Sequence, residues 1–392
     1  MKNRIAQRMA EINPFHVMEL LQRAKELEKQ GRDIIHMEIG EPDFKTPDPV
    51  LRAGIACLAQ GDVGYTEAQG LLELRIKIAQ YYQECYQQSV AVEQIFITPG
   101  ASGALLLALA ATLNPQDHLL MADPGYPCNR NFVQLFDATP KLIPVDAETR
   151  YQLTAELVQQ YWCEHTKGVL ITTPSNPTGT VIPDAELGRI VVQVAKEDGI
   201  LVVDETYQGL LYGHPPTTAL RYSEDVFILN SFSKYFGMTG WRIGWLIVPK
   251  AFTSSVLKLS QNLFIATSTP AQYAALAAFE DDNMRILENR RLEFSKRQDY
   301  LIHELLRLGF KIPLKPEGAF YLYANCADFT DDSFKFAYEL LESEGVAVTP
   351  GKDFGTFQAE QYLRFAYTTS IERIAEAIGR LEHFINQKKE GV

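Results

Sequence analysis

The segment from Asp225 to Trp245 places one lysine among several groups that can bind an anion. Its apolar first half leads into Ser231, Ser233 and Lys234, and Arg242 follows eight residues after the lysine. This order predicts a strand that ends at the edge of a sheet, where open α/β folds bind their ligands. The serine hydroxyls and the forked guanidinium suit a phosphate group. A lysine amine beside such an anion site favours a phosphate-bearing cofactor that is held as a Schiff base.

Within that segment, the sequence SFSKYFGMTGWRIG resembles the pyridoxal-phosphate attachment motif of the class I/II aminotransferases. The small residues, the lysine and the Gly-x-Arg-x-Gly ending fall in one short window, which makes the match specific. The resemblance implies that pyridoxal 5'-phosphate is the cofactor and that it is attached to Lys234. It also implies fold type I, in which helices flank a large, mostly parallel seven-stranded sheet and a smaller α+β domain follows.

A repeating pattern of short apolar runs begins at Gln94 and agrees with an α/β fold. The runs are QIFITPG, HLLMADPGYP, GVLITTPSNP, ILVVDETY and DVFILNSFS, and each ends in polar residues, Gly or Pro. Helix-like stretches such as 154–164 and 184–198 separate most of them, so we predict βαβ units and a mostly parallel sheet. The strand ends should therefore deliver these residues to one crevice: Ala101 to Gly103, Tyr126, Asn176, Asp204, Tyr207 and Ser231 to Lys234.

The turn that contains Ala101, Ser102 and Gly103 leads directly into the apolar stretch ALLLALAATL. A helix N-terminus offers free amide groups and positive partial charge to an anion, so this turn suits the cofactor phosphate. The serines and the arginine of the lysine segment would complete the phosphate site. A plain helix start would carry the same sequence, because the turn is not a dinucleotide fingerprint.

Four residues are candidates to hold the ring of the cofactor. The resemblance implies that Tyr126 stacks on the ring face. Asp204 ends an apolar run, where an unpaired carboxylate is costly to keep charged, and the ring nitrogen would be its cationic partner. Asn176 and Tyr207 could both donate hydrogen bonds to the phenolic oxygen of the ring, which would favour the phenolate and tune the Schiff-base pKa toward neutrality.

The resemblance implies substrate contacts at Gly40, Asn176 and Arg364. Gly40 lies in IGEPDF, which matches a loop that covers the substrate, and Arg364 lies in a strand-like apolar run where a guanidinium needs an anion. The implied anion is the substrate α-carboxylate, and a structural salt bridge is the alternative. Tyr65 matches a tyrosine that crosses a dimer interface to the cofactor phosphate of the other subunit, so a homodimer with shared sites is implied.

Composition excludes several other classes of function. The chain has 392 residues, of which 46% are hydrophobic, and a formal charge of -12, so its overall field would repel nucleic acid. The longest apolar run, Ala104 to Leu113, is too short to span a bilayer, and the first residues lack a secretory apolar region. Five scattered cysteines support neither a metal site nor a disulfide framework. We expect a cytoplasmic protein without nucleic-acid or membrane partners.

The matching motifs occur in the expected order from IGEPDF to Arg364, and we expect three parts in the chain. Residues 1–50 would form an N-terminal arm and part of the small domain, residues 51–284 the large cofactor-binding domain, and residues 285–392 the small C-terminal domain. The implied reaction is transamination of an L-amino acid with a 2-oxo acid, with 2-oxoglutarate as the expected acceptor, in a ping-pong sequence through pyridoxamine phosphate. The released Lys234 would move the proton from the substrate Cα.

Other reactions on the same scaffold remain open from the sequence. A carbon-sulfur β-lyase or a racemase could use the same residues. An acyl-transferring synthase usually stacks a histidine where this chain has Tyr126, and a cofactor-binding regulator usually carries a basic DNA-binding domain, for which we expect no room. One bacterial dicarboxylate branch carries a lysine where this chain has Ser102, so we expect broad use of alanine and of apolar or aromatic donors beside aspartate.

Overall fold

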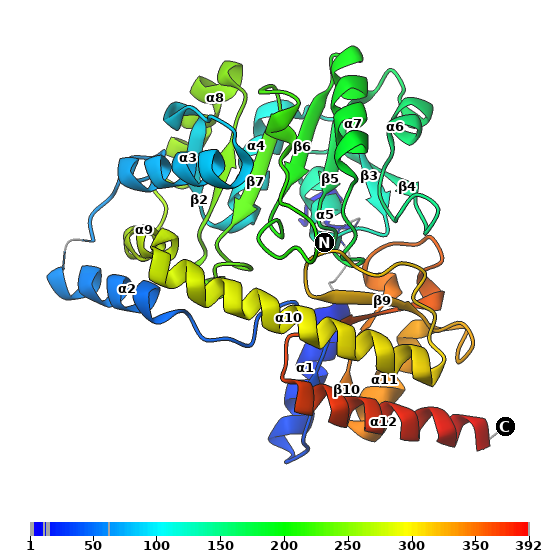
Figure 1. Cartoon of the computed structure of the whole chain (residues 1–392). Coiled ribbons are helices and arrows are strands. Elements are labelled where there is room, and N and C mark those ends of the chain that lie inside the picture. The colour runs from blue at the N-terminus through cyan, green and yellow to red at the C-terminus, as the bar shows by residue number, and fades with distance from the viewer. Residues whose placement is uncertain (1–3, 11, 13–15, 62, 391–392) are drawn as a thin grey trace.

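A seven-stranded sheet forms the centre of the larger part of the molecule (Figure 1). The computed structural model describes residues 4–10, 12, 16–61 and 63–390. In the sheet, β8 runs antiparallel to its two neighbours, and the other neighbouring strands are parallel. The strand order is β2 (Ile95–Thr98), β8 (Gly244–Ile247), β7 (Phe227–Ser231), β6 (Ile200–Asp204), β5 (Thr166–Thr172), β3 (His118–Asp123) and β4 (Thr139–Pro144). This sheet confirms the fold class predicted from the apolar runs.

Helices cover both faces of the sheet, which explains why its strands are almost continuously apolar. Along β6, Val202 belongs to the core on one face and Val203 to the core on the other. The core that contains Val202 includes α4 (Gly100–Thr112) and part of α8 (Thr253–Leu263). The helices with side chains in the opposite core include α2 (Asp48–Gln60), α3 (Leu72–Tyr86), α6 (Ala155–Tyr161), α7 (Asp184–Lys196) and α9 (Thr269–Leu276). A further helix, α5 (Pro127–Leu135), packs beside α4 and β4.

The smaller part is built around a three-stranded antiparallel sheet in the order β11 (Thr349–Pro350), β12 (Tyr362–Ala366) and β9 (Tyr321–Asn325). Its core also receives side chains from α11 (Ser333–Glu344) and α12 (Ile371–Glu390). A short parallel pair joins β1 (Ile35–His36) to β10 (Val346–Ala347). This pairing brings a segment near the N-terminus, preceded by α1 (His16–Lys29), to the C-terminal part of the chain.

The helix α10 (Asp281–Leu308) joins the two parts (Figure 1). Its Leu287 packs in the core of the large sheet, whereas Leu301 and Leu305 pack in the core of the smaller part. A single helix of 28 residues therefore fixes one part against the other. The predicted domain boundary at residue 285 falls inside this helix, and the division into three parts stays a prediction. Residues 1–3, 11 and 13–15 of the predicted first part lie outside the described residues.

No described helix is both long enough and apolar enough to cross a membrane. Within the same residues, no group of three or more His, Cys, Asp or Glu side chains could hold a metal ion.

Candidate active site

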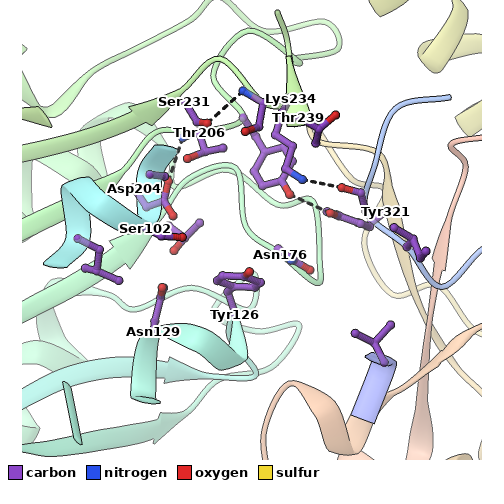
Figure 2. A pocket seen from close by; sticks show the side chains of 18 of the residues that line it. Ser102, Tyr126, Asn129, Asn176, Asp204, Thr206, Ser231, Lys234, Thr239 and Tyr321 are labelled. Atoms are coloured by element: carbon purple, nitrogen blue, oxygen red, sulfur yellow. Dashed lines mark hydrogen bonds between the residues drawn. The ribbon is translucent and has the colours of Figure 1, made fainter. Parts of the chain in front are cut away.

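A cavity of about 270 Å³ lies where the parallel strands end, and both parts of the chain line it (Figure 2). Thr172, Asp204 and Ser231 are the last residues of β5, β6 and β7, and Arg364 comes from β12. This confirms the expected convergence of strand ends, since parallel strands finish at one edge. The predicted site residues in its lining are Gly40, Ala101, Ser102, Tyr126, Asn176, Asp204, Tyr207, Ser231, Ser233, Lys234, Arg242 and Arg364.

Two predicted residues lie outside the lining of this cavity. Gly103 sits in the first turn of α4, and a Cβ there would lie 2.7 Å from Cδ of Pro99, so its small size serves close backbone packing. Tyr65 is 84% exposed and lies outside the cavity of its own chain. The expected role of Tyr65 at another subunit stays a prediction.

The amine of Lys234 is held at the cavity by a backbone contact. Its Nζ donates a hydrogen bond to the carbonyl oxygen of Gly40 at 2.5 Å (Figure 2). Burial lowers the pKa of Lys234 to about 8, and the charges of Arg364 and Arg242 act in the same direction, while Glu41 opposes them. A lysine with this pKa has a substantial neutral fraction near pH 7 to 8, so it can act as a nucleophile or a base.

The carboxylate of Asp204 faces the cavity from the end of β6. One oxygen accepts a hydrogen bond from the backbone N–H of Thr206 at 3.0 Å. Burial raises the pKa of Asp204, and the hydrogen bonds from Thr206 and the nearby charge of Lys234 only partly oppose this effect. A cationic N–H donor in the cavity would stabilise the carboxylate, as the protonated ring nitrogen of a pyridine cofactor does.

A tightly packed cradle lies between the start of α4, the end of β7 and Arg242. Glycines in it allow close contacts that a side chain would block. A Cβ on Gly100 would lie 2.7 Å from Nη2 of Arg242, and one on Gly244 would lie 3.0 Å from the amide nitrogen of Ala101. Gly100 also has a φ of +73°, which favours glycine. Arg242 donates to the carbonyl of Thr239 at 3.0 Å, a neutral partner that leaves its charge available. Free amides, serine hydroxyls and a guanidinium are the donors that a phosphate requires.

Arg364 is a buried cation whose hydrogen-bond partners are neutral. Its guanidinium, 4% exposed, donates to Oδ1 of Asn176 at 2.9 Å and to Oγ1 of Thr349 at 3.2 Å, and it also bonds the carbonyl of Glu38. Its buried Nε has no hydrogen-bond partner among the described residues. Among these residues, no carboxylate forms a salt bridge with it, so the structural salt bridge left open from the sequence is absent from the described part. A buried arginine of this kind is suited to an external carboxylate.

The contact with Arg364 also orients Asn176. Because the guanidinium donates to Oδ1, the amide nitrogen of Asn176 is left to donate elsewhere. Asn176 lines the cavity, so a phenolic oxygen of a bound ring is a suitable acceptor. The predicted role of Asn176 thus agrees with its orientation, and it remains a prediction.

The sequence did not identify several other residues of the cavity. Tyr321 is the most prominent, because its hydroxyl lies 2.8 Å from the hydroxyl of Tyr207, which was expected to point at the cofactor (Figure 2). Tyr321 lies in the run KPEGAFYLYAN, whose alternating aromatic residues do not reveal from the sequence which one faces a ligand. The other unpredicted residues in the lining include Val17, Met18, Leu21, Glu38, Ile39, Leu105, Asn129, Phe132, Thr206 and Thr239.

Comparison with known proteins decides the family. Residues 32–381 match the family model described as aminotransferase class I and II. The chain is a class I/II aminotransferase. Members of this family depend on pyridoxal phosphate, and the donors of the cavity fit this cofactor: a carboxylate for the ring nitrogen, a partly neutral lysine and a phosphate cradle.

Relatives of this aminotransferase match over nearly their full length. It is 36% identical to a (5-formylfuran-3-yl)methyl phosphate transaminase of Methanocaldococcus jannaschii, over 98% of this chain and 100% of that protein. It is also 36% identical to a valine–pyruvate aminotransferase of Mycobacterium tuberculosis, over 97% of this chain and 98% of the relative. The crystal structure of an aminotransferase from Mycobacterium tuberculosis superposes with a TM-score of 0.95 at 36% identity, covering 98% of this chain and 100% of the other.

The lowered pKa of Lys234 predicts how cofactor attachment depends on pH. Only the neutral amine attacks an aldehyde, so the rate at which the apoenzyme binds pyridoxal phosphate covalently should rise with pH and level off above about pH 8. A free lysine analogue should continue to gain rate until about pH 10.4. Stopped-flow absorbance measures both.

A matched variant checks the cause of this pH profile. Because the charge of Arg364 lowers the pKa of Lys234, Arg364→Gln should move the midpoint of the rate profile to higher pH. A wild-type rate that still increases between pH 9 and 10 would contradict the lowered pKa.

Proposed function

We propose that this aminotransferase moves the amino group of an L-amino acid to a 2-oxo acid, with 2-oxoglutarate as the acceptor, in a ping-pong sequence. The observation that carries the proposal is the buried guanidinium of Arg364, which has neutral partners and shares a cavity with Lys234. An amino acid and a 2-oxo acid share one feature, a carboxylate beside the reacting carbon. A single fixed arginine can therefore orient both substrates.

We propose that the cofactor is held at three points. Its phosphate is held by Ser102, Ser231, Ser233 and Arg242. Its ring nitrogen pairs with Asp204. Tyr126 covers one face of the ring, while Asn176 and Tyr207 donate to its phenolic oxygen. When bound, pyridoxal phosphate supplies an electron sink that makes the substrate Cα–H acidic.

Lys234 is the proposed attachment point and the proposed base. Its Nζ accepts the proton that leaves the substrate Cα, because its pKa near 8 leaves a minor but usable fraction of the amine neutral at physiological pH. The Gly40 carbonyl accepts a hydrogen bond from this Nζ and so fixes its position beside the substrate. Gly40 itself has no space for a side chain, since a Cβ would lie 1.9 Å from the hydroxyl oxygen of Tyr321.

The wall of the cavity supports neutral donors. One side of the cavity is apolar and is formed by Val17, Met18 and Leu21 of α1 and by Ile39. The cations of its described lining are Lys234, Arg242 and Arg364. These three have proposed roles, so the described lining offers no further cation for a second carboxylate. Apolar and aromatic donors, or alanine, should therefore react at least as well as aspartate.

A panel of amino donors with 2-oxoglutarate and pyruvate as acceptors tests this proposal. We expect glutamate to form from 2-oxoglutarate with alanine and with apolar or aromatic donors, and we expect parallel lines in double-reciprocal plots, as ping-pong kinetics require. An aspartate kcat/KM a hundredfold above every neutral donor would contradict the substrate choice. Ammonia release without an acceptor would favour the β-lyase alternative.

The variant Arg364→Gln serves as the control in this panel. Removing one partner of a buried charged pair costs about 3 to 5 kcal/mol, or roughly a few hundred to a few thousand fold in kcat/KM. Neutral and acidic donors should lose activity equally, because both present the same α-carboxylate. A loss confined to aspartate would mean that Arg364 binds the distal carboxylate instead.

We further propose that the enzyme is a homodimer whose two sites are shared. Tyr65 is 84% exposed, and α2 exposes Leu51, Ile55 and Leu58, an apolar row that a second copy would cover. The exposed Tyr65 then reaches the phosphate of the neighbouring subunit. The resemblance of its segment to the family motif supports this role.

Hybrid dimers test the shared sites. Lys234→Ala and Tyr65→Asp should each be nearly inactive alone, since the first lacks the attachment amine and the second places a carboxylate beside the phosphate. Mixing them after partial unfolding should restore activity, because one hybrid site carries both defects and the other carries none. Recovery of up to about a quarter of the wild-type activity is expected from random pairing of subunits. A fully active monomer in sedimentation analysis would contradict the dimer.

A further inference from the structure

Tyr321, the first residue of β9, contacts three separate elements of the active site. Its hydroxyl lies 2.8 Å from the hydroxyl of Tyr207, and the guanidinium of Arg364 lies 4.4 Å from its ring centroid. The same hydroxyl occupies the space that a side chain on Gly40 would need. Tyr321 thus touches a proposed cofactor contact, the proposed carboxylate site and the segment whose carbonyl holds Lys234.

The two tyrosine hydroxyls form a buried pair. Tyr321 is 1% exposed and Tyr207 is 5% exposed. Among the hydrogen bonds of the described residues, each hydroxyl has the other as its partner. A phenol hydroxyl has one proton to donate and can also accept, so only one of the two donates within the pair. If Tyr321 is that donor, the proton of Tyr207 remains free for a ligand in the cavity.

The position of Arg364 favours Tyr321 as the donor. Burial raises the pKa of Tyr321, and the positive charge of Arg364 is the first effect that opposes this rise. The same charge also lowers the pKa of Tyr207, but there it ranks behind burial and the effects of Tyr321, and the guanidinium lies over the Tyr321 ring. A cation near the ring makes the phenol a better donor, because it stabilises the negative charge that develops on the oxygen. Chains of hydroxyls also strengthen one another, since a hydroxyl that accepts a bond donates more strongly.

We propose that Tyr321 is a positioning residue that donates a hydrogen bond to Tyr207, directs the Tyr207 proton to the phenolic oxygen of the cofactor, and supports Arg364 with its ring. This inference rests on the proposed roles of Tyr207 and Arg364. The hydroxyl of Tyr321 acts on Tyr207 and its ring acts on Arg364, so two substitutions can separate the two roles. Tyr321→Phe removes only the hydroxyl, and Tyr321→Leu removes the ring as well.

The test of the hydroxyl is the pH titration of the visible absorbance of the cofactor in the holoenzyme. In Tyr321→Phe, Tyr207 donates more weakly and leaves more negative charge on the phenolic oxygen. This charge holds the proton on the neighbouring Schiff-base nitrogen more tightly, which raises the pKa of that nitrogen. The midpoint should therefore rise by roughly half to one pH unit. The KM of the amino donor should stay within about twofold of the wild-type value, because the ring remains beneath Arg364.

Tyr323→Phe is the matched control on the same strand. Tyr323 is also buried, but its hydroxyl has no hydrogen-bond partner among the described residues, and it lies outside the cavity lining. The midpoint should be unchanged in this variant. An equal shift in both variants would overturn the proposal, because it would report a general loosening of β9.

A double-mutant cycle shows whether Tyr321 acts through Tyr207. In the Tyr207→Phe background, Tyr321→Phe should cause no further shift of the midpoint, since the donor that it strengthens is gone. A full, additive shift in that background would overturn the proposal, and so would an unchanged midpoint in Tyr321→Phe alone.

The ring is tested by substrate affinity. Tyr321→Leu removes the face on which the buried guanidinium lies, so the KM of the amino donor should rise roughly tenfold or more, while Tyr321→Phe has no such effect. Equal KM values in the two variants would overturn the role of the ring. A normal titration in an enzyme that fails to transaminate would contradict the proposed substrates and leave the effect of Tyr321 on Tyr207 intact.

Discussion

The structure depends on charged groups that face one cavity and have neutral protein partners. Lys234 bonds the carbonyl of Gly40, Asp204 accepts from the amide of Thr206, and Arg364 bonds the side chains of Asn176 and Thr349. Charges removed from water without counterions are costly to maintain. Pyridoxal phosphate and, in the proposed reaction, a substrate carboxylate would supply the complementary charges.

The arrangement of the chain brings these groups together from distant segments. The parallel strands deliver Asp204 and Ser231 to one edge of the large sheet, and β12 brings Arg364 from the smaller part. Helix α10 packs in both cores and fixes the two parts relative to each other. The hydrogen bond between Lys234 and Gly40 joins two residues of the cavity lining that lie 194 positions apart in the sequence. The chemistry therefore relies on packing that lies outside the cavity.

Much of this arrangement could be predicted from the sequence, because apolar runs with polar ends report both the sheet and the edge where its strands finish. Tyr321 was missed because its role arises from tertiary packing against Gly40 and Arg364, which alternation along a strand does not encode. The boundary at residue 285 was placed inside α10, since a helix that serves two cores has no break in its pattern. The role proposed for Tyr65 requires a second subunit, so a single chain cannot define it.

Attachment of the cofactor to Lys234 is the central claim, and chemical mapping of the holoenzyme tests it most directly. Borohydride reduction of the bound cofactor, followed by proteolysis and mass spectrometry, should place the added mass on the peptide that contains Lys234. Lys234→Ala should take up no covalent label, although its phosphate cradle can still bind the cofactor. A label on another lysine, or a purified protein without cofactor absorbance after incubation with pyridoxal phosphate, would contradict the account.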